Sequence, residues 1–174
     1  EKASPGWLSL PFIFHNQNLS FMLKFTFSLA LTLLATLVFA QKEMHWDTHG
    51  VGFSVPSNFK EETNNAEEYT ASNDNLFLSI FPIQDETLTE GDLAQAVIEM
   101  ATGLEYDLVD EVDQIEIDDF TGYYVSGKKD GVSAVLMALM DVESSTNLLV
   151  VIVYNDDYFD EAVDMAGSFF AYDK

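Results

Sequence analysis

The chain has 174 residues, with 30 Asp and Glu against 7 Lys, and it contains neither Arg nor Cys. This excess of negative charge repels phosphate backbones and disfavours anionic membrane surfaces, so nucleic acid is excluded as a partner. It is compatible with cationic partners, with divalent cations or with simple solvation. Without Cys the chain has no disulfides, no thiol nucleophile and no site for lipid attachment, so its stability must come from packing.

The most apolar segment is "FTFSLALTLLATLVFA", residues 25–40, which has 16 residues without a charge behind Lys24. A transmembrane helix needs about 20 such residues. The shorter length and the preceding positive charge are typical of a secretory signal peptide. A retained anchor helix is the alternative.

A cleavage site follows from the end of this segment. Val38 and Ala40 supply the modest and small side chains that signal peptidase accepts at the −3 and −1 positions. We therefore predict a signal peptide over residues 22–40 that is cut between Ala40 and Gln41. The mature protein would then be exported, to the periplasm or the medium, without a membrane span.

The sequence from Met22 onward reads as a complete export signal, which leaves residues 1–21 without a role in it. We expect those residues to be translated upstream sequence or a misassigned start, with a genuine longer N-terminal region as the alternative. The mature part, residues 41–174, is of single-domain length. Residues 1–40 contain one acid and two Lys, so 29 acids and 5 Lys remain in the mature part.

The first part of the mature chain predicts strands. "GVGFSVP", residues 50–56, is a short strand that Pro56 ends, and the polar stretch 57–68 reads as a loop. Two strands flank a turn at residues 72–75. The second of them is apolar on both faces, which is usual for a central or helix-covered strand: one face carries Leu76, Leu78 and Ile80, and the other carries Phe77 and Phe81.

Two amphipathic helices are predicted. The first covers residues 90–104 behind a Thr89 N-cap, and the second covers residues 157–171 behind Asp156 or Asp157. Their apolar faces are, in the first helix, Leu93, Val97, Met100 and Leu104, and in the second, Phe159, Ala162, Val163, Ala166 and Phe170.

Between the helices the period changes to two, which predicts a strand meander. Asp130-Gly131 has the residue types of a type I′ hairpin turn, and a second turn at residues 144–147 leads into "LLVVIVY", residues 148–154. This last strand is apolar throughout and should lie in the middle of the sheet. The predicted fold class is α+β: a mostly antiparallel sheet with two packed amphipathic helices.

This order of elements resembles the PsbP-like superfamily. The resemblance rests on "GVGFSVPSNF", the central helix, "TGYYVSG", the apolar meander and a terminal helix ending in "SFF", over residues 44–171. The superfamily includes the extrinsic PsbP protein of photosystem II and a nuclear-import factor that binds the GTPase Ran. The resemblance implies a non-enzymatic binding or assembly domain. It carries over no functional residue, and the lack of Arg departs from the basic docking surfaces that such proteins use.

"HWDTH" is the one cluster with metal-ligand character. His45, Asp47 and His49 offer imidazole and carboxylate groups that suit zinc or copper. In a strand, however, residues i and i+4 are about 13 Å apart, which is too far for one ion. Ordinary surface histidines are therefore the alternative that we prefer.

The acidic run "DLVDEVDQIEIDD" is the second candidate. It holds seven carboxylates, of which Asp107, Asp110 and Asp113 are the calcium-ligand candidates. The run lacks the D-x-D-x-D-G spacing and the Gly turn of a calcium loop. A solvated acidic face is the simpler interpretation.

Enzymatic motifs are lacking. The sequence has no G-x-S-x-G, no phosphate loop and no dinucleotide fingerprint. We therefore expect an exported, non-catalytic binding or accessory domain that needs no cofactor and binds an unknown protein or small molecule, for which positive charge would be complementary. The alternatives are a calcium-binding protein and a small hydrolase with an unrecognised carboxylate pair.

Overall fold

This computed structural model describes residues 41–84, 88–144 and 146–172. The predicted segments 1–21 and 22–40, including Ala40, lie outside the described residues. In chain order the elements are β1 (Gln41–Trp46), η1 (Asp47–His49), β2 (Val51–Pro56), β3 (Lys60–Asn64), β4 (Tyr69–Ser72), β5 (Leu76–Pro82), α2 (Glu90–Gly103), β6 (Asp107–Leu108), β7 (Asp113–Ile117), β8 (Phe120–Lys129), β9 (Val132–Asp141), β10 (Asn147–Tyr154), η2 (Asp156–Tyr158), α3 (Phe159–Ala166) and β11 (Phe170–Ala171).

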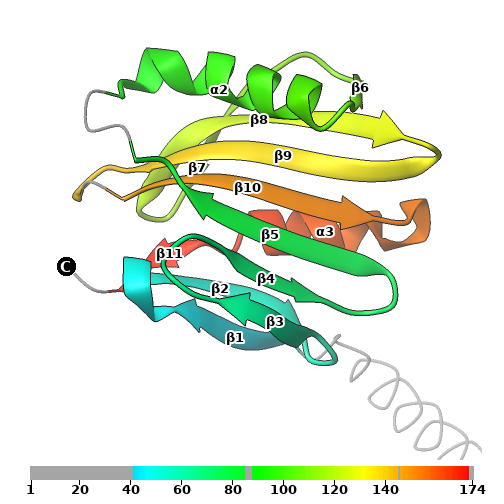
Figure 1. The fold of residues 1–174 in the computed structure, drawn as a ribbon, viewed down its shortest axis with the longest axis horizontal. Helices are drawn as coiled ribbons and strands as arrows, with labels where there is room; N and C mark the ends of the chain where they lie inside the picture. Colours follow the sequence, from blue (N-terminus) through cyan, green and yellow to red (C-terminus); the bar gives the residue numbers. More distant parts are fainter. Residues whose placement is uncertain (1–40, 85–87, 145, 173–174) are drawn as a thin grey trace, which may run out of the picture. The chain divides into compact units, whose positions relative to one another are not determined.

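The strands form two antiparallel sheets (Figure 1). The large sheet has the order β3-β4-β5-β10-β9-β8-β6, with β7 also paired to β8, and the small sheet has the order β1-β2-β11. Helix α2 covers part of one face of the large sheet, while α3 and the small sheet lie on the other face. The α+β prediction is therefore confirmed, although one sheet was expected and the first strands form a second sheet.

The predicted meander is also confirmed. β8, β9 and β10 are consecutive neighbours, and β10 lies between β9 and β5 in the interior of the sheet. The turn between β8 and β9 has φ of 52° at Asp130 and 85° at Gly131. Both values lie in the left-handed region that a type I′ turn requires, which explains why Asp and Gly stand there.

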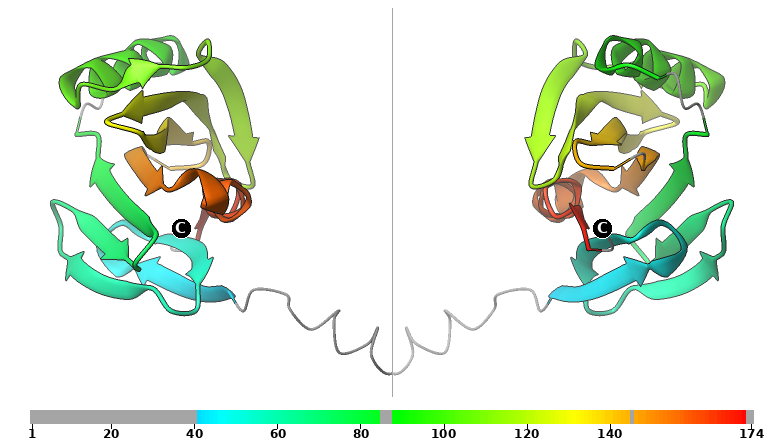
Figure 2. Two further views of the ribbon diagram at one scale, coloured as in Figure 1. Left: turned by 90° about the vertical axis from the view of Figure 1, so that its right-hand side faces the viewer. Right: turned by 90° about the vertical axis from the view of Figure 1, so that its left-hand side faces the viewer.

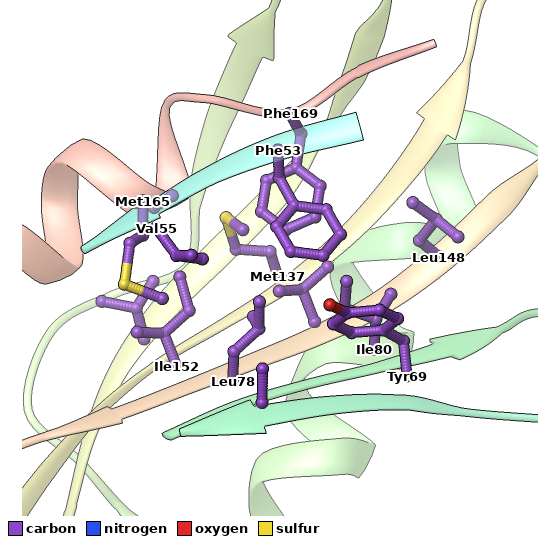
Figure 3. Packing of buried hydrophobic residues seen from close by; sticks show 14 of the residues in the cluster. Phe53, Val55, Tyr69, Leu78, Ile80, Met137, Leu148, Ile152, Met165 and Phe169 are labelled. Carbon is purple, nitrogen blue, oxygen red and sulfur yellow. The ribbon is translucent and has the colours of Figure 1, made fainter. Parts of the chain in front are cut away.

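The main core fills the space between the large sheet, the small sheet and α3 (Figure 3). Phe53 of β2 stacks on Phe169, with ring centroids 5.3 Å apart, and Tyr69 of β4 meets the edge of Phe53 at 5.0 Å. Leu78 and Ile80 of β5 point into this core, as the alternation predicted. The small sheet is thus held by aromatic packing against the large one.

A second core lies under α2. Leu93, Val97 and Ala101 are fully buried against apolar side chains of β8 and β9. Thr89 is the N-cap, as predicted, and its backbone N–H and its hydroxyl both donate to the carboxylate of Asp92, at 2.9 and 2.6 Å. This pairing fixes the first turn of the helix.

One residue of the predicted stripe departs from it. Leu104 is the C-cap beyond the last helical residue, and 42% of its surface is exposed. The helix ends one residue earlier than predicted, at Gly103, so the final position of the stripe is not held against the sheet. The buried stripe instead includes Ala101.

The prediction of one helix over residues 157–171 is wrong. The helix α3 ends at Ala166, and the chain then turns so that Phe169 enters the core and Phe170 pairs with β2. The turn is held by Ser168, whose hydroxyl donates to the Met165 carbonyl at 2.8 Å and accepts the Ser54 N–H at 2.9 Å. A contact across 114 residues therefore ends this helix.

The predicted cap and buried face of this helix also need correction. Neither Asp156 nor Asp157 caps α3; both lie in η2, and the Asp156 carboxylate accepts from Lys128 at 2.8 Å. Phe159 and Val163 were expected inside, but they are 52% and 47% exposed. The core instead takes Ala162, Met165 and Ala166.

Four short strands were missed, including the two-residue strands β6 and β11. β1 and β3 are rich in charged and polar residues, and residues 57–68 were predicted as a loop. Both strands lie at sheet edges, where side chains face water and the main chain supplies the pairing. None of the described helices has the length and apolarity needed to cross a membrane.

Candidate functional site

A cleft of about 910 Å³ lies between the segment that carries β7 and the helix α3. Figure 2 shows β7 reaching down toward α3 on one side of the molecule. The lining comes from three stretches of the chain: the segment from Asp110 to Glu116, the strands β8 and β9, and α3 with the following Gly167. We call this hollow the β7–α3 cleft.

Apolar side chains form the base and one wall of the β7–α3 cleft. Tyr124 and Val135 come from the large sheet, Ile115 comes from β7, and Phe159 and Val163 come from α3. Phe159 and Val163 are one helical turn apart, so they form a continuous stripe on one side of α3. Their exposure leaves apolar surface in water that a bound partner could cover.

The other wall of the cleft is acidic. Asp110, Glu111, Asp113 and Glu116 all line it, and all four are exposed. The described residues that line the cleft include neither Lys nor His. Uncompensated carboxylates beside an apolar wall produce a negative local potential that attracts cations.

Nearby Lys side chains are engaged elsewhere. Lys128 binds Asp156 at 2.8 Å, and Lys129 binds Glu105 at 3.0 Å. These ion pairs lower the pKa of Asp156, with the Ser133 hydroxyl also contributing, and the pKa of Glu105. The acidic wall of the β7–α3 cleft therefore keeps its charge without a neutralising partner from these Lys residues.

The cleft lies along a strand edge. β7 pairs with β8 from Asp113 opposite Tyr124 to Ile117 opposite Phe120, and within the described residues it has no second partner. The short strand β6 instead occupies the far end of β8, opposite Lys128. Because backbone groups of an antiparallel strand alternate in direction, every second N–H and C=O of β7 points away from β8, and among these the Gln114 N–H is bound by the Asp113 carboxylate at 2.9 Å.

The first metal candidate is not assembled around one point. His45 Nε2 lies 2.7 Å from Glu43 Oε1, and His49 Nε2 lies 2.9 Å from the Ala66 carbonyl oxygen. Asp47 begins η1 and accepts a hydrogen bond from the Tyr172 hydroxyl at 2.5 Å. The three side chains thus have three different hydrogen-bond partners, and zinc or copper binding by them stays a prediction.

The second candidate divides between two places. Asp107 begins β6, whereas Asp110 and Asp113 line the cleft. One carboxylate oxygen of Asp113 accepts the neighbouring Gln114 N–H at 2.9 Å. Across the described ranges, no group of three or more His, Asp and Glu side chains is arranged to hold a metal ion. Calcium binding here therefore stays a prediction that would require these loops to move.

The carboxyl groups with shifted pKa do not suit acid catalysis. Hydrogen bonds from Thr89 lower the pKa of Asp92, just as Lys contacts lower those of Glu105 and Asp156. A general acid at neutral pH needs a raised pKa, which is the opposite direction. These three groups serve a helix start and two surface ion pairs.

A second hollow lies on the opposite face of the large sheet, beside α2. It consists of two adjoining depressions of about 400 and 450 Å³ that share Phe81, Leu104 and Val151. Its rim carries Glu68 and Lys129, so its charge is mixed. Nothing in this face selects one class of ligand.

The β7–α3 cleft was not predicted as a unit. Its acidic side was noted in the sequence as a run of carboxylates. Phe159 and Val163 were assigned to the core because they repeat at helical spacing. That spacing shows an apolar stripe, but it does not show whether another element covers the stripe.

No protein-family model matches the sequence, and no curated protein matches at a significant level. Among solved structures, the Ran-binding protein Mog1p of Saccharomyces cerevisiae superposes with a TM-score of 0.53 and 13% identity, covering 78% of this chain and 97% of Mog1p. LpqN of Mycobacterium tuberculosis, involved in cell envelope biogenesis, has a TM-score of 0.45 and 12% identity over 73% of this chain and 85% of LpqN.

A protein of Bacteroides thetaiotaomicron has a TM-score of 0.49 and 10% identity, and covers 76% of this chain and 49% of its own. At such identities the likenesses concern fold alone, and the match to Mog1p spans nearly all of that protein. The match to Mog1p therefore supports the predicted resemblance at the level of the fold, which this chain shares with that Ran-binding protein.

Proposed function

We propose that this protein is a small exported domain that binds or assists a partner without catalysing a reaction, and that the β7–α3 cleft holds that partner. The observation that carries the proposal is the exposure of Phe159 and Val163, 52% and 47%, in a cleft whose opposite wall is acidic. The Ran-binding activity in the name of Mog1p is consistent with a binding role for this fold, by analogy only.

The chemistry of the cleft selects the partner. A ligand with apolar groups would cover the α3 stripe, which removes apolar surface from water. Positive groups beside them would lie near Asp110, Glu111 and Glu116. An anionic ligand would be repelled by the same carboxylates, so the matching partner is both apolar and cationic.

A short synthetic peptide provides the probe. An acetylated and amidated heptapeptide of alternating Lys and Val carries both features, and the same peptide with Glu in place of Lys is its control. We expect calorimetric titration at low salt to show saturable binding of the Lys peptide alone. Binding of both peptides, or of neither, would contradict the proposed chemistry.

Matched variants locate the binding. Val163→Lys places a charge on the cleft wall, and Leu104→Lys places one on the similarly exposed α2-side hollow. We expect the first variant to lower the affinity for the Lys peptide by at least about tenfold, because it adds a positive charge and removes an apolar contact. The second variant should leave its affinity unchanged. Equal effects of the two would place the site elsewhere.

Calcium binding is the second candidate, because Asp110, Glu111 and Asp113 lie close together in sequence on one side of the cleft. Calcium takes six to eight oxygen ligands, whereas magnesium demands a stricter octahedron. A calcium site would raise the melting temperature more in CaCl2 than in MgCl2 of equal concentration, and Asp110→Asn would remove the difference. Equal shifts in both salts would indicate charge screening only.

Export rests on the predicted signal peptide. We expect the mature protein from its native host to begin at Gln41, which is also the first residue of β1. Intact-mass measurement combined with N-terminal sequencing tests this. A mature protein that retains residues 25–40 would indicate an anchored form instead.

A further inference from the structure

We propose that the partner enters the β7–α3 cleft as a peptide segment in extended conformation and adds as a new strand to the outer edge of β7. This inference deepens the proposed function and rests on it. It specifies what holds the partner, namely main-chain hydrogen bonds from β7, in addition to the apolar and acidic side chains of the cleft.

The edge is present and accessible. Within the described residues β7 pairs only with β8, over five residue pairs from Asp113 to Ile117. All residues from Asp110 to Glu116 line the cleft, so the hollow follows the strand along most of its length. An incoming strand would therefore find open space and backbone groups that β8 leaves unpaired, and it would displace the Asp113 carboxylate from the Gln114 N–H.

The helix on the far side completes a groove. α3 lies across the cleft from β7 and contributes Phe159, Val163 and Ala166 to the lining. A groove between an edge strand and a helix accepts an extended peptide, because the strand binds the peptide main chain while the helix contacts alternate side chains. The five-residue length of β7 matches a bound segment of about five to seven residues at ~3.3 Å per residue.

Charge determines which segment can pair. Gln114 and Glu116 point to one face of β7 and Asp113 and Ile115 to the other, so both faces carry a carboxylate next to the edge. Opposite charges on neighbouring strands stabilise pairing, and like charges destabilise it. A basic segment is therefore favoured.

The same charges argue against a second copy of this chain as the occupant. Two β7 edges would bring Asp113 and Glu116 of one protomer against those of the other, which is unfavourable. Charged edge strands commonly block self-association in this way. The charges of β7 therefore disfavour pairing with a second copy of β7 and favour pairing with a basic segment.

Alternate N-methylation of the probe tests the main-chain contact. Two versions of the Lys-Val heptapeptide are needed, one methylated on the amides of the odd residues and one on those of the even residues. In a bound strand only one of these sets faces β7. We expect one version to lose at least about tenfold in affinity, because hydrogen bonds are removed and the methyl groups meet the strand. The other version should lose much less.

Hydrogen exchange on the protein gives an independent readout. Upon binding of the unmethylated peptide, amides of alternate residues in β7 should become protected, by at least about tenfold, because every second N–H faces the new strand. The edge strand β3, which lies far from the cleft in the strand order, is the internal control and should not change.

The outcomes separate the two proposals. If the Lys peptide fails to bind, the proposed function itself is refuted. If it binds but both methylated versions bind equally well, or alternate β7 amides stay unprotected, the partner uses side chains alone and strand addition is wrong. If one methylated version is selectively weakened and alternate β7 amides are protected, strand addition is supported. If the protein without peptide dimerises as its concentration rises, a second copy of the chain occupies the β7 edge, and the argument that like charges prevent this pairing is wrong.

Discussion

Two phenylalanines near the ends of α3 allow a direct test of which apolar surface serves folding and which serves binding. Phe169 is 1% exposed and stacks on Phe53, whereas Phe159 is 52% exposed in the β7–α3 cleft. Truncating each to Ala removes the same atoms. The difference between the two variants therefore reports the environment of the ring, apart from the helix propensity that Ala adds at position 159.

The magnitudes follow from burial. Phe169→Ala leaves a cavity in the closed core, and such changes cost about 3–5 kcal/mol. Full burial of a Phe side chain is worth about 1.5–3 kcal/mol, so the half-exposed ring of Phe159 contributes roughly 1 kcal/mol to the free energy of unfolding. The higher helix propensity of Ala offsets part of that loss. We expect Phe169→Ala to be at least about three times as destabilising.

Urea unfolding followed by far-UV circular dichroism measures both variants. The loss of affinity for the Lys-Val peptide should be larger for Phe159→Ala than for Phe169→Ala. Phe159→Ala removes ring surface that the peptide would cover, which should cost about 1 kcal/mol of binding free energy, or roughly fivefold in affinity. Phe169→Ala, measured where it is still folded, should bind almost normally. Equal destabilisation by the two variants, or unchanged affinity of Phe159→Ala, would refute the assignment of this ring to the cleft.

Three further predictions concern the frame of the site. Gly122→Ala should destabilise by about 1–3 kcal/mol or more in urea, since its β-carbon would lie 2.0 Å from a backbone oxygen of β9. Gly103→Ala, with nothing within 4 Å, should instead stabilise by up to about 1 kcal/mol. The lowered pKa of Asp156, caused first by its bond from Lys128, adds stability above about pH 4 that is lost on acidification through the lower folded pKa. Asp156→Asn should therefore approach wild-type stability as the pH falls.

Local signals in the sequence were sufficient for the meander and for α2. Asp130-Gly131 fixes a turn by its own backbone preferences, and the strand at residues 148–154 has to be interior because it is apolar on both faces. These features depend on neighbours in sequence. The same holds for the start of α2, where Thr89 and Asp92 bind each other three residues apart.

The misassigned features depend on distant partners. The end of α3 is set by Ser168 binding Ser54, and the strands β1 and β3 form although most of their residues are charged or polar. The β7–α3 cleft could not be predicted for the same reason, because its walls come from segments about 50 residues apart. Helical spacing placed Phe159 and Val163 on one stripe, but only the tertiary structure shows that this stripe faces a groove rather than the core.

The two hollows of this fold differ in what they can offer a partner. The α2-side hollow has apolar side chains comparable to those of the cleft, including Phe81 at 37% exposure. Its floor, however, is formed by β5 and β10, which are paired on both edges, so it can offer side chains alone. The β7–α3 cleft adds an unpaired strand edge and a single sign of charge. Main-chain pairing supplies affinity that tolerates many side chains, and the carboxylates restrict which segments are admitted. We therefore place the selectivity of this protein in the β7–α3 cleft rather than in the α2-side hollow.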